Sequence, residues 1–202
     1  MVVGVIVARK IRDAPRGAIH HVVNRGNRRN IIFHKPGDYE AFVAVLTEAC
    51  ARFEMRLLAF CVMPNHWHLV LWPPVDVSLS AFMQWLTSTH VRRYHAHYEL
   101  VGTGHLYQAR YRNHVCESEG RLLAAIRYVE ANALAANLVE SAKDWPWCSL
   151  AVRTNGDEGR LLAECPITLP CNWAAYVDDV TQREGPVDAI DCTTADSPVE
   201  LL

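Results

Sequence analysis

The sequence contains no hydrophobic run that approaches the roughly 20 residues needed to span a bilayer. Its apolar N-terminal stretch, residues 1–8, is short, and Arg9 and Lys10 come after it, whereas a signal peptide carries its basic residues first. Seven cysteines without paired spacing are typical of reduced thiols, and because no Cys-x-x-Cys occurs, a zinc ribbon is not expected. We therefore expect a cytoplasmic protein that does not enter a membrane.

Net charge is also small, because the 202 residues carry a formal charge of −2, and this value alone argues against binding to nucleic acid. The charges are nevertheless segregated along the chain. Residues 1–153 contain 18 Lys and Arg against 12 Asp and Glu, a net charge of +6, whereas residues 154–202 contain 2 against 10, a net charge of −8. A basic body with an acidic end is a pattern of nucleic-acid-binding proteins, although a soluble domain with a disordered acidic end would show it as well.

The composition divides the chain into three parts. Residues 1–16 are interpreted as a basic N-terminal arm, 17–150 as one domain with a sizeable core, and 151–202 as an acidic, partly disordered tail. Trp173 and Tyr176 are the aromatic residues that can anchor part of this tail. No internal repeats occur.

Hydrophobic periodicity predicts alternating strands and helices. The expected elements in chain order are a strand at 18–24, a helix at 37–53, a strand pair at 57–63 and 64–73, a helix at 78–98, a strand or strand pair at 105–116, and a helix from 119 that ends in a left-handed conformation at Asn137. This order is a split βαβ pattern. It predicts an α+β, ferredoxin-like fold with an antiparallel sheet and helices packed on one face.

Two histidines follow the turn of the central hairpin. In a strand that starts after Pro64 and Asn65, alternation turns His66 and His68 to one face and Trp67 to the other. Two residues along a strand span roughly 6.6 Å, so both imidazoles can bind one cation. The alternative is two surface or core histidines that share a face by chance.

Two groups of arginines are candidates for contacts with DNA. The turn after the first strand carries Arg25, Arg28 and Arg29, and guanidinium groups in such a turn suit phosphates. Arg110 and Arg112 lie two residues apart and are expected to share one strand face. The alternative for both groups is solvated basic surface.

The helix from residue 119 carries a second polar pair. Tyr128 and Asn132 are four residues apart and therefore neighbours on one helix face, and Arg121 lies on the same side. A tyrosine beside a core stripe is expected to use its hydroxyl group. The alternative is that Tyr128 only fills space in the core.

Several of these segments resemble one family. The stretch MPNHWHLVLWP at 63–73 resembles the His-hydrophobic-His motif of single-tyrosine HUH transposases, and the REP-associated tyrosine transposases are the branch it resembles most. The stretch YVEAN at 128–132 resembles the catalytic segment of that family. The resemblance runs from residue 17 to residue 149, and its other segments are 25–29, 32–33, 107–111 and 144–149.

The resemblance implies an activity and a site. Tyr128 would be the nucleophile that cuts single-stranded DNA next to a hairpin and forms a covalent 5′-phosphotyrosine intermediate. His66, His68 and Asn132 would hold a divalent metal ion, and such mixed nitrogen and oxygen ligands suit Mn²⁺, or Mg²⁺ with more waters. Arg121 would steady the phosphate. The implied protein is a nucleoid-associated monomer or homodimer that acts on hairpin-forming repeats.

The chain departs from the family pattern after the tyrosine. The family usually has Pro and Gly at the positions of Ala133 and Asn137, and Asn can adopt the left-handed turn that Gly supplies. Two other functions also fit the sequence. One is a sheet-based nucleic-acid-binding module without catalysis. The other is a metal-dependent hydrolase with water as its nucleophile, which would leave no covalent protein–DNA adduct.

Overall fold

A computed structural model describes residues 15–156 and 161–179 of the chain. The predicted basic arm falls almost entirely outside the described residues, as does the predicted disorder at the C-terminal end. Four strands form one antiparallel sheet in the order β2-β3-β1-β4. They are β1 (His20–Arg25), β2 (Arg56–Met63), β3 (His66–Trp72) and β4 (Arg112–Val115). This order confirms the predicted α+β fold with an antiparallel sheet.

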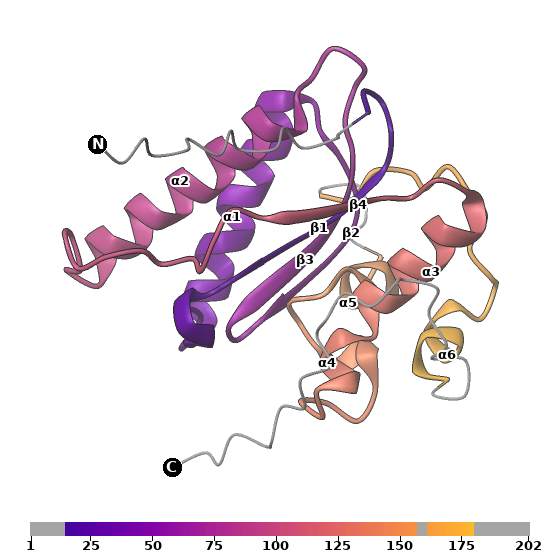
Figure 1. Cartoon of the computed structure of the whole chain (residues 1–202). Coiled ribbons are helices and arrows are strands. Elements are labelled where there is room, and N and C mark those ends of the chain that lie inside the picture. The colour runs from indigo at the N-terminus through magenta and orange to yellow at the C-terminus, as the bar shows by residue number, and fades with distance from the viewer. Residues whose placement is uncertain (1–14, 157–160, 180–202) are drawn as a thin grey trace, which may run out of the picture.

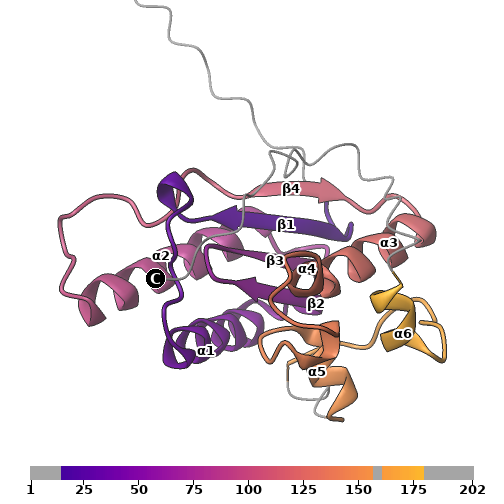
Figure 2. The same cartoon turned by 90° about the horizontal axis from the view of Figure 1, so that it is seen from below.

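Helices cover both faces of this sheet (Figures 1 and 2). The long helices α1 (Pro36–Phe53) and α2 (Leu79–His97) pack together on one face, as predicted. The opposite face is covered by α3 (Glu119–Glu130), with shorter helices around it. These are α4 (Asn132–Ala135), α5 (Ser149–Thr154), α6 (Trp173–Asp178) and the single turn η2 (Ala142–Asp144). The expectation that every helix lies on one face is therefore corrected for α3.

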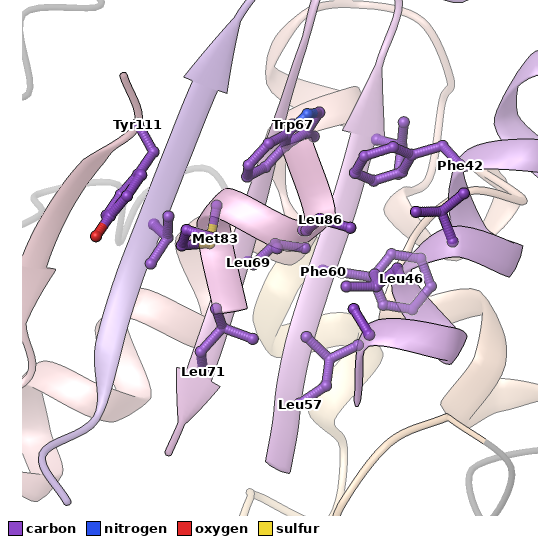
Figure 3. Close-up of a cluster of buried hydrophobic side chains, with 14 of the residues drawn as sticks. Phe42, Leu46, Leu57, Phe60, Trp67, Leu69, Leu71, Met83, Leu86 and Tyr111 are labelled. Carbon is purple, nitrogen blue, oxygen red and sulfur yellow. The ribbon is translucent and has the colours of Figure 1, made fainter. Parts of the chain in front are cut away.

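The physical reason for two covered faces is that β2 is apolar on both sides and Val70 of β3 extends its second apolar face. Trp67, Leu69 and Phe60 point toward α1 and α2, where they meet Phe42 and Leu86 (Figure 3). The alternate residues of β2 and β3 point to the opposite face of the sheet, where they pack against the apolar side of α3. That second cluster includes Cys61, Met63 and Val70 from the sheet and Leu122, Ile126 and Val129 from α3.

The fourth strand is shorter than expected, because regular pairing covers only residues 112–115 of the predicted 105–116. The backbone before it instead closes the basic turn: Asn27 N–H donates to the Leu106 carbonyl, and Gln108 N–H donates to the Arg25 carbonyl. The Tyr107 side chain turns into the core. It accepts a hydrogen bond from Trp67 Nε1 (3.0 Å) and lies 2.6 Å from His90 Nδ1.

The predicted last helix is interrupted near the site. Regular α-helix ends at Glu130, Ala131 has φ −82° and ψ −4°, and a separate turn, α4, begins at Asn132. Asn137 follows with φ +56°, which confirms the left-handed conformation expected where the family has Gly. The proline lost at Ala133 leaves a buried alanine that packs with the α3 cluster.

A fully buried carboxylate ties α3 to the chain that follows it. Glu130 accepts hydrogen bonds from Ser149 Oγ (2.6 Å), Arg153 Nε (3.0 Å) and Trp173 Nε1 (2.5 Å). Arg153 also donates to the Leu58 carbonyl of β2. Trp173 thus anchors part of the C-terminal region, as predicted. A charge removed from water needs such partners, so this cluster holds the α3 helix against the sheet edge.

The aromatic loop at 144–149 packs back onto the body, as predicted. Trp145 Nε1 donates to the Val62 carbonyl at 2.9 Å, and the Trp147 ring stacks on Tyr39 with centroids 5.1 Å apart. This loop covers the outer edge of β2, where Trp147 accepts from Val62 N–H. In the described part of the chain, none of the helices has the length and apolar character needed to cross a bilayer.

Buried His90 makes stability depend on pH. Burial lowers its pKa from 6.5 to about 4, so the unfolded chain binds the proton more readily between these values. The contribution of His90 to the unfolding free energy is therefore complete above pH 6.5 and decreases as pH falls toward 4. The wild type should lose unfolding free energy between pH 7.5 and pH 5. We expect this loss to be about 2 kcal/mol smaller in His90→Gln, as measured by urea titration at both pH values. The same change at exposed His105 is the control, and equal pH slopes for the two variants would contradict the assignment.

The Glu130 cluster predicts unequal roles for two Arg–Glu pairs. Arg153→Met leaves the carboxylate of Glu130 buried without its counter-ion, and we expect a loss of about 3–5 kcal/mol in unfolding free energy. Arg93→Met removes an ion pair with Glu48 whose side chains are 50% and 48% exposed, and we expect little change. Chemical denaturation measures both. Similar midpoints for the two variants would show that Glu130 does not depend on Arg153.

Candidate active site

The predicted histidine pair lies on the α3 face of the sheet. Alternation along β3 sends Trp67 and Leu69 into the α1–α2 core, so His66 and His68 point the other way. His68 is fully buried beneath α3, while His66, at the start of the strand, is partly exposed. The two rings lie edge to face with centroids 5.1 Å apart.

Each of these rings has its Nδ1 atom engaged. His66 Nδ1 lies 2.6 Å from Asn65 Oδ1, and His68 Nδ1 lies 3.0 Å from Nε2 of His21 on β1. Nε2 is therefore the nitrogen that each histidine would offer to a metal ion. His68 Nε2 is buried and has no hydrogen-bond partner among the described residues. A bound metal ion would satisfy such a nitrogen, and the described residues hold three more of this kind, Nδ1 of His21 and both ring nitrogens of His20.

The electrostatics of His68 agree with that role. Burial lowers its pKa well below 6.5, and the nearby His66, His21 and Arg25 side chains lower it further. Burial, together with His114, likewise lowers the pKa of His21 to about 3. Both rings are neutral at physiological pH, which is the form that binds metal ions.

Tyr128 meets the histidines from the helix above. The buried stripe of α3 packs on β2 and β3 and places the half-buried Tyr128 ring over this part of the sheet. Its centroid lies 5.6 Å from that of His68 and 5.7 Å from that of His21, edge to face in both cases. Strand and helix thus bring together residues that are 60 positions apart in the chain.

Asn132 lies one turn further along, at the start of α4. Its Nδ2 donates to the Tyr128 carbonyl at 3.1 Å, so Oδ1 is the amide atom left for another partner. No group of three His, Cys, Asp or Glu side chains able to hold a metal ion occurs in the described ranges. A metal ion at this site would depend on two imidazoles, the Asn132 oxygen, and oxygens from phosphate and water.

The predicted arginines lie in different parts of the structure. Arg25 ends β1 directly opposite His66 in the sheet register, and Arg112 begins β4 opposite Val23, on the same face. Arg28 and Arg29 form the turn η1 (Asn27–Arg29) with φ of +53° and +62°. Arg121 is in the first turn of α3 and forms an ion pair with Glu117 at 3.4 Å.

Arg110 does not share a strand face with Arg112, because β4 begins only at Arg112. The preceding backbone is used to close the η1 turn, as described above. Gly26 makes that turn possible: a Cβ atom there would lie 2.4 Å from the Asn30 carbonyl oxygen and 2.9 Å from Ile32 Cγ2. The basic turn therefore depends on glycine at position 26.

His21 is the site residue that sequence reasoning missed. It lies in the predicted first strand, and alternation with Val23 assigns it a face. His21 belongs to the site only because β1 pairs with β3, and this pairing places His21 diagonally across from His68. A single sequence does not reveal which strands are neighbours or in what register.

Comparisons with known proteins bear on the family and the fold of this chain. The sequence model described as transposase, IS200-like, matches residues 16–132. Among solved structures, a REP-associated tyrosine transposase bound to a REP hairpin aligns with a TM-score of 0.60 and 15% identity, over 82% of this chain and 96% of that chain. A candidate transposase from Deinococcus radiodurans R1 aligns with a TM-score of 0.45 and 18% identity, over 57% and 91%. No curated protein sequence matches the chain. The first structure shows a shared fold.

Proposed function

Because the chain belongs to the family of IS200-like transposases, we propose that it cuts and rejoins single-stranded DNA beside hairpins, with Tyr128 as the nucleophile. The family supports DNA processing of the transposase type. The hairpin partner is suggested by the structure that shares the fold and is bound to a REP hairpin.

The observation that carries the proposal is the position of Tyr128 among the seven tyrosines, all of which lie in the described ranges. Five of them belong to the α1–α2 side of the sheet, and these are Tyr39, Tyr94, Tyr98, Tyr107 and Tyr111. Tyr176 stacks on Trp173 and under Arg127, at the far side of α3. Tyr128 is the tyrosine whose ring packs against His21 and His68.

The residues present fit a divalent cation. His66 and His68 would bind it through Nε2 and Asn132 through Oδ1, and a bound Mn²⁺ or Mg²⁺ would withdraw charge from a phosphate oxygen. The buried, unpartnered Nε2 of His68 supports this set. Mn²⁺ is the better match to two nitrogens, because Mg²⁺ prefers oxygen ligands.

Tyr128 would carry the covalent step. Its hydroxyl oxygen attacks the phosphorus in line with the 3′ oxygen, so a Tyr–O–P bond forms while the P–O3′ bond breaks. The phenolic proton leaves to solvent, and the departing 3′ oxygen takes up a proton to become a hydroxyl. One ester replaces another, so the 3′-hydroxyl can reverse the reaction without an external energy source.

The uncovered half of the sheet face provides a path for DNA. The α3 helix packs on β2 and β3, whereas Arg112 and His114 on β4 remain exposed on the same side. A strand that crosses β4 would pass Arg112 and Arg25 before it reaches the histidines. The Arg28–Arg29 turn lies at the adjoining end of β1 and exposes two more arginines that would contact phosphates.

The first test concerns the nucleophile. We expect Tyr128→Phe to bind a hairpin DNA as the wild type does, to change unfolding free energy by at most about 1 kcal/mol, and to form no covalent adduct. The assay incubates labelled single-stranded hairpin DNA with Mn²⁺ and separates adducts on a denaturing gel. Tyr176→Phe, on the same side of the sheet but away from the histidines, is the control and should retain the adduct.

The same gel separates the alternative functions. Cut DNA without any adduct in the wild type would indicate a hydrolase that uses water. Bound but uncut DNA would indicate a binding module. An adduct that survives in Tyr128→Phe would assign the nucleophile to another tyrosine.

The second test concerns the arginines. Single changes to Gln at Arg25, Arg28, Arg29, Arg110 and Arg112 should each weaken hairpin binding and lower the slope of log K against log salt by about 1. Fluorescence anisotropy at several salt concentrations measures the slope. Arg52→Gln, on α1 at the opposite face, should leave it unchanged. An unaltered slope in a protein with all five replacements would contradict the proposed path.

A further inference from the structure

His21, on β1, contacts the histidine pair through His68. Its Nε2 lies 3.0 Å from His68 Nδ1, and the two rings stack with centroids 5.2 Å apart and planes 21° from parallel. Both side chains are buried, with 1% and 0% of their surface exposed. The contact spans two strands, because His21 pairs with Val70 and His68 with Val23 in the register.

The chemistry of imidazole makes this contact directional. A neutral ring carries one proton, so a hydrogen bond between two ring nitrogens requires N–H on one and a lone pair on the other. If His68 offers the Nε2 lone pair to a metal ion, its proton is on Nδ1, and this N–H needs an acceptor. His21 Nε2 is the acceptor at hydrogen-bond distance.

His21 also contacts the tyrosine. Its ring meets the Tyr128 ring edge to face at 5.7 Å, nearly the same distance as between Tyr128 and His68. One side chain from β1 therefore supports both a metal ligand on β3 and the nucleophile on α3. Asn65 Oδ1 has the corresponding position at His66 Nδ1.

We infer that His21 is a positioning residue, which accepts the Nδ1 proton of His68 and thereby holds Nε2 of His68 toward the metal ion and beside Tyr128. Partners of this kind orient ligating histidines and typically change metal affinity by about 10- to 100-fold. The inference rests on the proposed function in one respect, namely that His68 is a metal ligand.

The experiment measures Mn²⁺ binding to DNA-free protein by isothermal titration calorimetry. We expect His21→Leu, which removes the acceptor at similar volume, to weaken Mn²⁺ binding by about 10- to 100-fold. His21→Gln places an amide oxygen near the position of Nε2, and we expect it to recover most of the affinity. His114→Leu, on the neighbouring strand and without a hydrogen bond to His68, should bind Mn²⁺ as the wild type does. Metal-free hairpin binding by His21→Leu and His21→Gln should match that of the wild type.

A second measurement needs no variant. In metal-free wild-type protein with ¹⁵N-labelled histidine, two-bond ¹⁵N–¹H spectra report which ring nitrogen of His68 carries the proton. We expect the proton on Nδ1 and a bare, pyridine-type Nε2. This result does not depend on whether His21→Leu folds.

The outcomes are separable. A folded His21→Leu that binds Mn²⁺ as tightly as the wild type, or a His68 proton on Nε2, would overturn the role of His21 while leaving adduct formation by the wild type intact. A wild type that neither binds Mn²⁺ nor forms an adduct would overturn the metal site and the positioning role together. Weak binding by His21→Leu with recovery in His21→Gln would support the role, because a merely structural loss would not be repaired by an amide.

Discussion

The period of two along β3 is the constraint on which the rest of this structure depends. The same seven residues supply an apolar face to the α1–α2 core and a histidine face to α3. A shift of one residue in register would turn both imidazoles into the α1–α2 core and Trp67 toward α3. The apolar half of β3, with Trp67, Leu69 and Leu71 all buried, therefore fixes the direction of His66 and His68 more firmly than any polar contact does.

The helix that carries the tyrosine is held from a part of the chain outside the family match. The match ends at residue 132, yet Glu130 is bound by Ser149, Arg153 and Trp173, and Arg127 donates to the Tyr176 and Asp179 carbonyls. Tyr128 lies two residues before Glu130, so these contacts anchor the part of α3 that carries the tyrosine. The C-terminal packing is in this sense part of the scaffold of the candidate site, although it contributes no side chain to the histidine cluster.

The site has buried, stacked histidines next to a strand that remains exposed. His68 and His21 are buried and stacked, and their ring nitrogens are oriented by each other, so metal ligation would require little rearrangement. The neighbouring β4 leaves Arg112 and His114 exposed, because α3 does not extend over it. The η1 turn adds two arginines in left-handed backbone, a conformation that costs about 1–2 kcal/mol per residue and is retained where the chain around it is tightly fixed. Such an arrangement suits a long, charged substrate that enters from one edge.

Sequence alone determined the features that depend on local periodicity. Spacing and turn chemistry within about 20 residues predict the hairpin, the two long helices, and the sheet face of His66 and His68. They also predict that Tyr128 and Asn132 are neighbours and that Asn137 has a left-handed conformation. Tertiary structure decided what depends on contacts between distant segments. The pairing of β1 with β3 brings His21 into contact with His68. Residues 106–108 close the basic turn, and this separates Arg110 from Arg112. The second apolar face of the β2–β3 hairpin packs against α3, which therefore lies on the opposite side of the sheet from α1 and α2. These outcomes rest on which strands become neighbours, and a pattern of residues along one chain does not contain that information.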